Sequence, residues 1–230
     1  MKIEEIVSWL DTTLRVADFS DDVSNNGLQI ARTDDGRGVR TVAFAVDASR
    51  RAIEAARRAH AELLVVHHGI SWGGGIRRLA GGVYEVVKAA IEANLALYAC
   101  HLPLDAHPTL GNNAALARRF GLQNLVPAFN YHGHRIGLVG EVNGVKIGVC
   151  SGGAGDFAEE AKRLGCARYV TGEANWGEKI AAENCGMTME CLGHYETETG
   201  GVTSLAQTLQ AALPVACVNL TKDLQEKEVK

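Results

Sequence analysis

The chain lacks the marks of secreted and membrane proteins. Its six cysteines show no C-x-x-C spacing, and several lie in apolar, strand-like runs, so we expect buried, reduced thiols. No stretch approaches the roughly 20 apolar residues of a membrane span. The first residues include two glutamates, where a signal peptide would need an apolar core. These absences predict a cytoplasmic protein that does not interact with a membrane.

Positive charge is also scarce. The chain has 23 lysines and arginines against 27 aspartates and glutamates, which gives a net charge of −4. A non-specific nucleic-acid binder is usually basic, so the composition argues against that class. The overall composition, with 47% hydrophobic and 22% charged residues, is ordinary for a globular protein with a full core. A length of 230 residues allows one large domain or two small lobes.

Several catalytic motifs are missing. No serine lies in a G-x-S-x-G elbow, and no cysteine stands beside an identified base. The glycine-rich stretch 151–155 lacks both the P-loop lysine and the G-x-G-x-x-G spacing. It predicts either a plain strand-to-helix turn or a phosphate cradle made of backbone N–H groups before a helix.

Hydrophobic periodicity predicts alternating helices and strands, which is typical of an α/β fold. We expect helices at 2–16, 49–60, 82–93, 112–120, 156–164, 175–184 and 199–212. We expect strands at 27–30, 39–46, 63–66, 95–100, 136–142, 145–150, 167–170, 187–192 and 215–218, and a polar tail at 221–230. Asn143-Gly144 is a strong hairpin signal. This alternation of strands and helices occurs roughly twice, which indicates two related lobes. No proline- or serine-rich linker separates them.

Histidines and carboxylates, the residue types that bind metal ions, follow three of the predicted strands. They are His67 and His68, then His101 with Asp105, then His194 with Glu198. Ligands bind at the carboxyl ends of strands in α/β sheets, so these positions predict a metal site. A helical turn would place His194 and Glu198 on one side. Imidazoles and carboxylates suit zinc, manganese, iron, cobalt or nickel, and a carboxylate can bridge two ions that activate water for hydrolysis.

Two readings stay open for the residues around the first histidine pair. One of the two histidines would pack in the core and the other would be solvated if the pair had no ligand. Trp72, in the glycine-rich loop that follows, would stack on a planar ligand, form a subunit contact or pack on its own loop.

The sequence resembles the Nif-three-like dinuclear-metal proteins, often labelled GTP cyclohydrolase type-two homologues. The matching segments are Asn26-Gly27-Leu28-Gln29, Val66-His67-His68-Gly69, His101-Leu102-Pro103-Leu104-Asp105-Ala106-His107-Pro108 with Gly111-Asn112-Asn113, Thr171-Gly172-Glu173, and Gly193-His194 with Thr197-Glu198. They run from residue 26 to residue 198, so the likeness covers nearly the whole chain, which looks like the short form of the family.

The resemblance implies two divalent metal ions per chain. His68 and Asp105 would hold one ion, His67 and His194 the other, and Glu198 would bridge both. His101 would lie behind these ligands and steer a ligand or relay a proton. The resemblance also implies two intertwined, similar α/β lobes with small mixed sheets flanked by helices, and a toroidal homohexamer. We place the approximate lobe boundary between residues 1–124 and 125–230.

The function implied is that of a metal-dependent hydrolase acting on a small-molecule substrate such as a nucleotide. One candidate reaction is GTP cyclohydrolase-type ring opening by metal-activated water, with Glu198 and His101 as the catalytic groups. The alternative is a non-catalytic metal-binding ring scaffold or metal chaperone.

Overall fold

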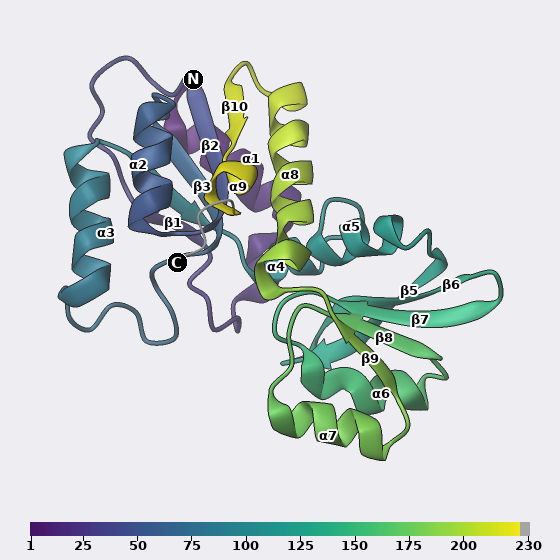
Figure 1. Cartoon of the computed structure of the whole chain (residues 1–230). Coiled ribbons are helices and arrows are strands. Elements are labelled where there is room, and N and C mark those ends of the chain that lie inside the picture. Colours follow the sequence, from purple (N-terminus) through teal and green to yellow (C-terminus); the bar gives the residue numbers. More distant parts are fainter. Residues whose placement is uncertain (226–230) are drawn as a thin grey trace. The chain divides into compact units, whose positions relative to one another are not determined.

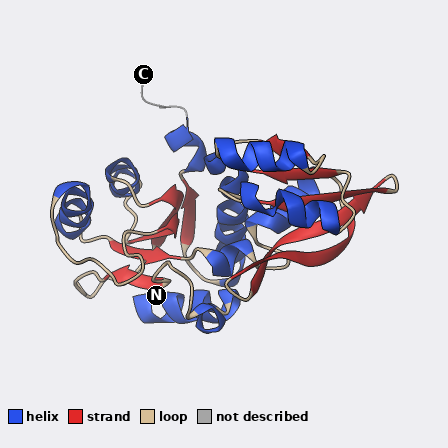
Figure 2. Ribbon diagram, turned by 90° about the horizontal axis from the view of Figure 1, so that it is seen from below, coloured by secondary structure: helices blue, strands red, loops and turns tan. Residues whose placement is uncertain are grey.

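The computed structural model describes residues 1–225 of the 230 and divides them into two compact units. The first unit contains Met1–Pro103 and the segment from Val202 onward, and the second contains Leu104–Gly201. The second unit is therefore an insertion into the sequence of the first. In each unit helices flank the strands, which Figure 2 draws in blue and red.

The first unit is built on a five-stranded sheet of order β1-β4-β3-β2-β10. Its strands are β1 (Gly27–Ile30), β2 (Thr41–Asp47), β3 (Leu63–His68), β4 (Ala96–Ala99) and β10 (Ala216–Asn219). Only β1 runs antiparallel to its neighbour, and the other pairs are parallel. The carboxyl ends of β2, β3 and β4 therefore lie along one edge of this sheet, and each is followed by polar residues.

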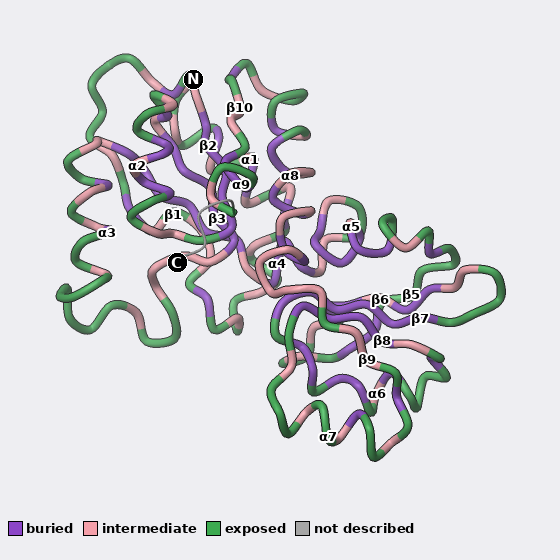
Figure 3. The backbone as a smooth tube through the Cα atoms, in the orientation of Figure 1, coloured by how far each residue is buried: buried purple, intermediate pink, exposed green. Residues whose placement is uncertain are grey.

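Helices cover both faces of this first sheet (Figure 1). On one face lie α2 (Arg50–Arg58) and α3 (Gly81–Glu92), whose alanines and Ile53 pack with Leu64, Val66 and Leu97. On the other lie α1 (Ile3–Leu14), joined to β4 by the hydrogen bond from Tyr98 to Asp11, and the later part of α8 (His194–Ala212). With both faces covered, the central strands are buried except at their ends, as the purple trace in Figure 3 shows.

The second unit carries a five-stranded sheet of order β5-β6-β7-β8-β9. Its strands are β5 (Gln123–Tyr131), β6 (His134–Val142), β7 (Val145–Cys150), β8 (Arg168–Thr171) and β9 (Thr188–Cys191). The first three strands are antiparallel and the last three are parallel. The turn between β6 and β7 is the predicted one, and its residues Asn143 and Gly144 both have positive φ, as a type I′ turn requires.

The second sheet is also flanked by helices. On one face α5 (Asn112–Arg119) packs Leu116 and Ala117 against Ile147 and Val149. On the other lie α6 (Ala158–Arg163), the short helix η2 (Gly155–Phe157) and α7 (Trp176–Asn184). The remaining helical pieces are η1 (Val16–Phe19), α4 (Leu102–Asp105) and α9 (Thr221–Gln225). The chain leaves the first unit within α4 and returns to it within α8.

The structure confirms the predicted fold class, because it contains two mixed five-stranded sheets flanked by helices. It adds β5, which the sequence did not suggest. The strand contains Pro127, its pairing with β6 shifts register between Gln123 and Val126, and Asn124 and Phe129 have positive φ. An edge strand tolerates these features, and they hide its periodicity.

The position of the last strand differs from the expected lobe boundary at 124/125. Strand β10 pairs in parallel with β2 of the first sheet, so the C-terminal segment belongs to the first unit. Part of the polar tail, Thr221–Gln225, is helical, and residues 226–230 lie outside the described part of the chain. Among residues 1–225, no helix is long and apolar enough to span a bilayer.

Candidate metal centre

In the first unit, three of the predicted histidines come together. His67 and His68 end β3, and His101 follows the parallel neighbour β4, so all three lie at the carboxyl edge of the sheet. One ring nitrogen of each lies within 4.8 Å of the others. The ring centroids of His67 and His101 are 5.2 Å apart. The expectation that ligand-binding residues gather at the carboxyl ends of the strands is therefore confirmed for these three imidazoles.

Each ring of this cluster is held by an oxygen on its Nδ1 side. His67 Nδ1 lies 2.9 Å from the carbonyl oxygen of Cys100, and His68 Nδ1 lies 2.8 Å from Asp47 Oδ1. His101 Nδ1 lies 3.0 Å from Asp22 Oδ1. These oxygens only accept, so Nδ1 donates to them and Nε2 is the nitrogen left to face a ligand. Imidazoles that bind metals are commonly oriented in this way.

Of the two carboxylates among these partners, Asp22 is the buried one, because its side chain is fully buried whereas that of Asp47 is half exposed. Burial disfavours its charge, but hydrogen bonds from His101, Asn26 and the Ser24 amide outweigh that effect and lower the pKa of the carboxyl. Asp22 also accepts from the backbone of Leu102. The residue therefore fixes both the tautomer of His101 and the chain that follows it.

In the second unit, His194 and Glu198 form a pair on the first turns of α8. Helix α8 begins at His194, earlier than the expected start at 199, so the turn that carries both residues is helical and they share one side of it. His194 Nε2 lies 3.2 Å from Glu198 Oε1. The other nitrogen, Nδ1, lies 2.9 Å from Glu173 Oε1, at the end of β8. Glu198 is 3% exposed, so this carboxylate is a buried acid that faces an imidazole.

Glycines bring the backbone close to this pair. A Cβ atom on Gly152 would lie 2.5 Å from Glu198 Oε1 and 3.3 Å from His194 Nε2. A Cβ on Gly172 would lie 2.6 Å from Thr197 Oγ1 and 2.9 Å from His194 Cα. The glycines that follow β7 and β8 thus leave room for the acid and the imidazole, and larger residues would fill that room.

The glycine-rich stretch at 151–155 is a strand-to-helix turn. Three of its five amides are used within the unit: Ser151 N donates to Asn113, Gly152 N to Thr197 Oγ1, and Ala154 N to Thr171 Oγ1. Backbone N–H groups that are already donated do not cradle a phosphate. The stretch instead positions the backbone beside Glu198.

Asp105 lies in the second unit as a buried carboxylate. Its Oδ1 accepts from Asn112 Nδ2 at 2.8 Å and from Ser151 Oγ at 3.1 Å. Ser151 precedes Gly152, so Asp105 is tied to the turn that packs against Glu198. Each unit therefore holds part of the predicted ligand set, with a chemistry of imidazoles and buried carboxylates that fits borderline divalent ions.

The sequence did not identify Asp22, Asp47 and Glu173 as partners of the histidines. Asp47 ends β2 in register with His68, and Glu173 follows β8, so the same expectation about strand ends could have found both. Asp22 lies in a polar loop 79 positions from His101, and no local pattern marks it.

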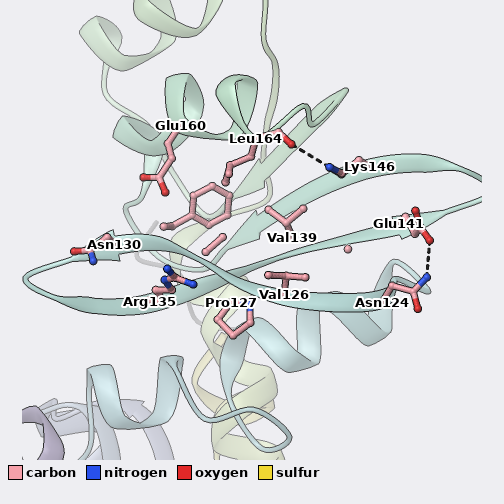
Figure 4. A pocket seen from close by; sticks show the side chains of 13 residues that line it. Asn124, Val126, Pro127, Asn130, Arg135, Val139, Glu141, Lys146, Glu160 and Leu164 are labelled. Atoms are coloured by element: carbon pink, nitrogen blue, oxygen red, sulfur yellow. Dashed lines mark hydrogen bonds between the residues drawn. The ribbon is translucent and has the colours of Figure 1, made fainter.

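A cavity of about 430 Å³ lies elsewhere in the second unit, between the β5–β6–β7 part of the sheet and α6 (Figure 4). Val126, Pro127, Val139 and Leu164 give it an apolar lining, and Lys146 donates to the Leu164 carbonyl oxygen across its edge. None of the predicted metal ligands lines it.

Metal affinity is expected to rise with pH up to about 9. The hydrogen bond and charge of Glu198, with help from Glu173, outweigh burial and raise the pKa of His194 from 6.5 to about 9. In the metal-free chain, the extra stability from the imidazolium is complete below pH 6.5 and is lost as the pH rises through 9. A metal ion requires the neutral ring, so the proton competes with it in this range.

Competition with a metal-indicator dye between about pH 7 and pH 10 measures this effect, which we expect to approach tenfold in affinity per pH unit. In the Glu173→Gln protein, the metal affinity should level off at a lower pH, because His194 loses one of the two carboxylates that raise its pKa. An affinity that is constant across this range would contradict the protonated state of His194.

Comparison with known proteins identifies the family of this chain. The family model described as Duf34/NIF3 (NGG1p interacting factor 3) matches residues 1–145 and 143–224. A protein of Deinococcus radiodurans named GTP cyclohydrolase 1 type 2 homolog is 37% identical, with 90% of this chain and 88% of the relative covered. A protein of Archaeoglobus fulgidus with the same name is also 37% identical, with 96% and 98% covered.

Among solved structures, TTHA1606 from Thermus thermophilus is similar, with a TM-score of 0.79, 30% identity and 96% of this chain and 98% of that chain covered. The match at the level of sequence and of fold extends over both units. The chain belongs to the Duf34/NIF3 family.

Proposed function

We propose that the protein is a dinuclear metal-dependent hydrolase that acts on a nucleotide or a related small molecule. The proposed ligands come from both units: His67 and His68 from the first, and Asp105, His194 and Glu198 from the second. Glu198 would bridge the two ions, and zinc, iron, manganese, cobalt and nickel are the candidate metals.

One observation carries this proposal. His67, His68 and His101 each have an oxygen within 3.0 Å of Nδ1, which leaves Nε2 to face a ligand. His194 lies between two carboxylates, with Glu173 at Nδ1 and Glu198 at Nε2. Histidines with purely structural roles have no reason to share one orientation. Bound together, two such ions would polarise a substrate and lower the pKa of a coordinated water toward about 7.

The chain's own residues would supply the proton transfers and the orientation. Asp22 holds the proton on His101 Nδ1, so His101 Nε2 is the atom that accepts or donates a proton at the site. The carboxylate of Glu173 orients His194, and Asp47 orients His68. Asn112 and Ser151 hold Asp105 through its Oδ1.

The name of the two relatives, GTP cyclohydrolase 1 type 2 homolog, suggests GTP as a first substrate to test. Elemental analysis of the untreated protein should give about two metal ions per chain. Protein stripped and then reloaded with each candidate metal is assayed against GTP and a panel of phosphoesters. Metal-dependent turnover supports the hydrolase, whereas tight metal binding with no turnover of any substrate favours the non-catalytic scaffold or chaperone.

The proposal includes a homohexameric ring in the cytoplasm. All six cysteines lie in the described residues as free thiols, as expected in a reducing compartment. Light scattering of the purified protein gives the assembly mass, which is compared with the chain mass of 24.5 kDa.

A further inference from the structure

The loop after the first histidine pair is rich in glycine, yet it is firmly held. Gln29 Oε1 accepts from the amides of Ile70 at 2.7 Å and of Ser71 at 3.2 Å, and Gln29 Nε2 donates to the Asn25 carbonyl at 2.7 Å. Asn25 in turn donates from its side chain to Ser71 Oγ and from its amide to the Ser71 carbonyl. The loop is therefore fixed to β1 and to the segment before it.

The glycine at the start of the loop is required by the same packing. A Cβ atom on Gly69 would overlap the side-chain amide of Gln29 and would lie 2.6 Å from the Ala99 methyl group. Further along, Gly73 N donates to the Val23 carbonyl, and Trp72 forms a bridge with Ser24. These contacts give Trp72 a defined position.

That position is beside the histidine cluster. The Trp72 ring centroid lies 5.1 Å from the ring of His101, in an edge-to-face arrangement, and 6.0 Å from the ring of His68. The residue is still 38% exposed. Its indole N–H is already donated to the Gly69 carbonyl at 3.0 Å. What Trp72 offers a ligand is therefore aromatic surface, and not a hydrogen bond.

Positive charge follows in the same segment. Arg77 folds back on the loop, with Nη2 3.6 Å from the place that a Cβ on Gly74 would take. Neither Arg77 nor Arg78 has an ion-pair partner within residues 1–225. A guanidinium without an ion-pair partner, in the same loop as an exposed aromatic ring, suits a ligand that joins a flat ring to an anionic group.

We propose that Trp72 is a stacking platform that selects substrates with a planar aromatic base, and that Arg77 binds their phosphate. The inference rests on the proposed function, since it names nucleotides as the substrate class of the same site. Trp72 is a specificity residue in this view, because it contacts the base while the histidines and carboxylates serve the reaction.

Binding is measured by tryptophan fluorescence and by calorimetry with three probes: GMP, guanosine and ribose 5-phosphate. In the metal-loaded parent protein, GMP and guanosine should quench the emission of Trp72. The Trp72→Ala variant should bind GMP roughly 5- to 100-fold more weakly, the range that loss of base stacking produces. Trp72→Phe should retain most of the affinity, because it keeps an aromatic face.

Two controls separate the contributions. Trp9→Phe, a change of the same type on α1, should leave the quenching and the affinity for GMP unchanged. Arg77→Gln should weaken GMP and not guanosine. Ribose 5-phosphate should bind weakly and should not respond to Trp72→Ala. Metal content should be the same in all variants.

The inference is overturned if Trp72→Ala binds GMP as tightly as the parent, or if this variant loses its metal, since Trp72 would then be only a wall of the metal site. The outcomes also separate it from the hydrolase proposal. Turnover of aliphatic phosphoesters with no preference for a ring refutes the stacking platform and retains the hydrolase. Trp72-dependent binding of GMP without any turnover supports the platform and refutes the hydrolase.

Discussion

Replacement of Glu198 by glutamine is expected to leave the fold intact and to remove most of the bound metal and all metal-dependent turnover. Glutamine keeps the volume of this buried side chain but has no charge to bridge two cations. Loss of an outer hydrogen-bond partner already lowers metal affinity about 10- to 100-fold, so loss of a ligand should cost at least the upper end of that range.

The measurement combines elemental analysis, a metal titration and the substrate assay on the same preparation. Glu183→Gln on α7 is the matched control, because it removes the same charge from an exposed position in the same unit. Its metal content and turnover should equal those of the parent. If Glu198→Gln retains two ions and full turnover, the proposed ligand set is wrong.

Substitution of Gly152 by alanine is expected to weaken metal binding at the same site although it removes no ligand. Gly152 has a φ of +69°, and its added methyl group would lie 2.5 Å from Glu198 Oε1. The left-handed backbone costs an alanine about 1–2 kcal/mol. The clash adds to that cost, and it displaces the carboxylate, so metal affinity should fall by roughly tenfold or more.

Gly144→Ala separates these two effects. Gly144 has a similar φ of +74°, but a methyl group there would meet no atom within 4 Å. This control should lose stability in denaturant by about the backbone cost of 1–2 kcal/mol and bind metal normally. Equal metal affinity in the two variants would show that Gly152 does not shape the site.

Local pattern was sufficient for much of this protein. The apolar run that ends at His67 and His68 is a buried strand, because continuous hydrophobicity suits a strand covered on both faces. The spacing of His194 and Glu198 placed them on one side of the chain if their turn was helical, and α8, which begins at His194 and not at the expected 199, makes it so. These features depend on residues that are neighbours in the sequence.

Other features depend on contacts between distant segments. Strand β5 was missed because an edge strand is not held to the usual alternation and accepts Pro127. The sequence predicted β10 as a strand but did not show which sheet it joins. Its partner β2 lies 175 positions earlier, as in the pair Ala216 and Thr41, and no local pattern reports such a pairing. Asp22 was missed because only the folded loop brings it to His101.

The sequence by itself determined the residue types of the candidate site and the strand ends near which the histidines lie. Only the tertiary structure decided which sheet each terminal strand joins, which oxygen holds each imidazole, and that the glycine-rich loop is fixed with Trp72 beside the histidines. The physical reason is that periodicity reports local burial, whereas pairing and hydrogen bonding between remote segments depend on the shape of the whole core.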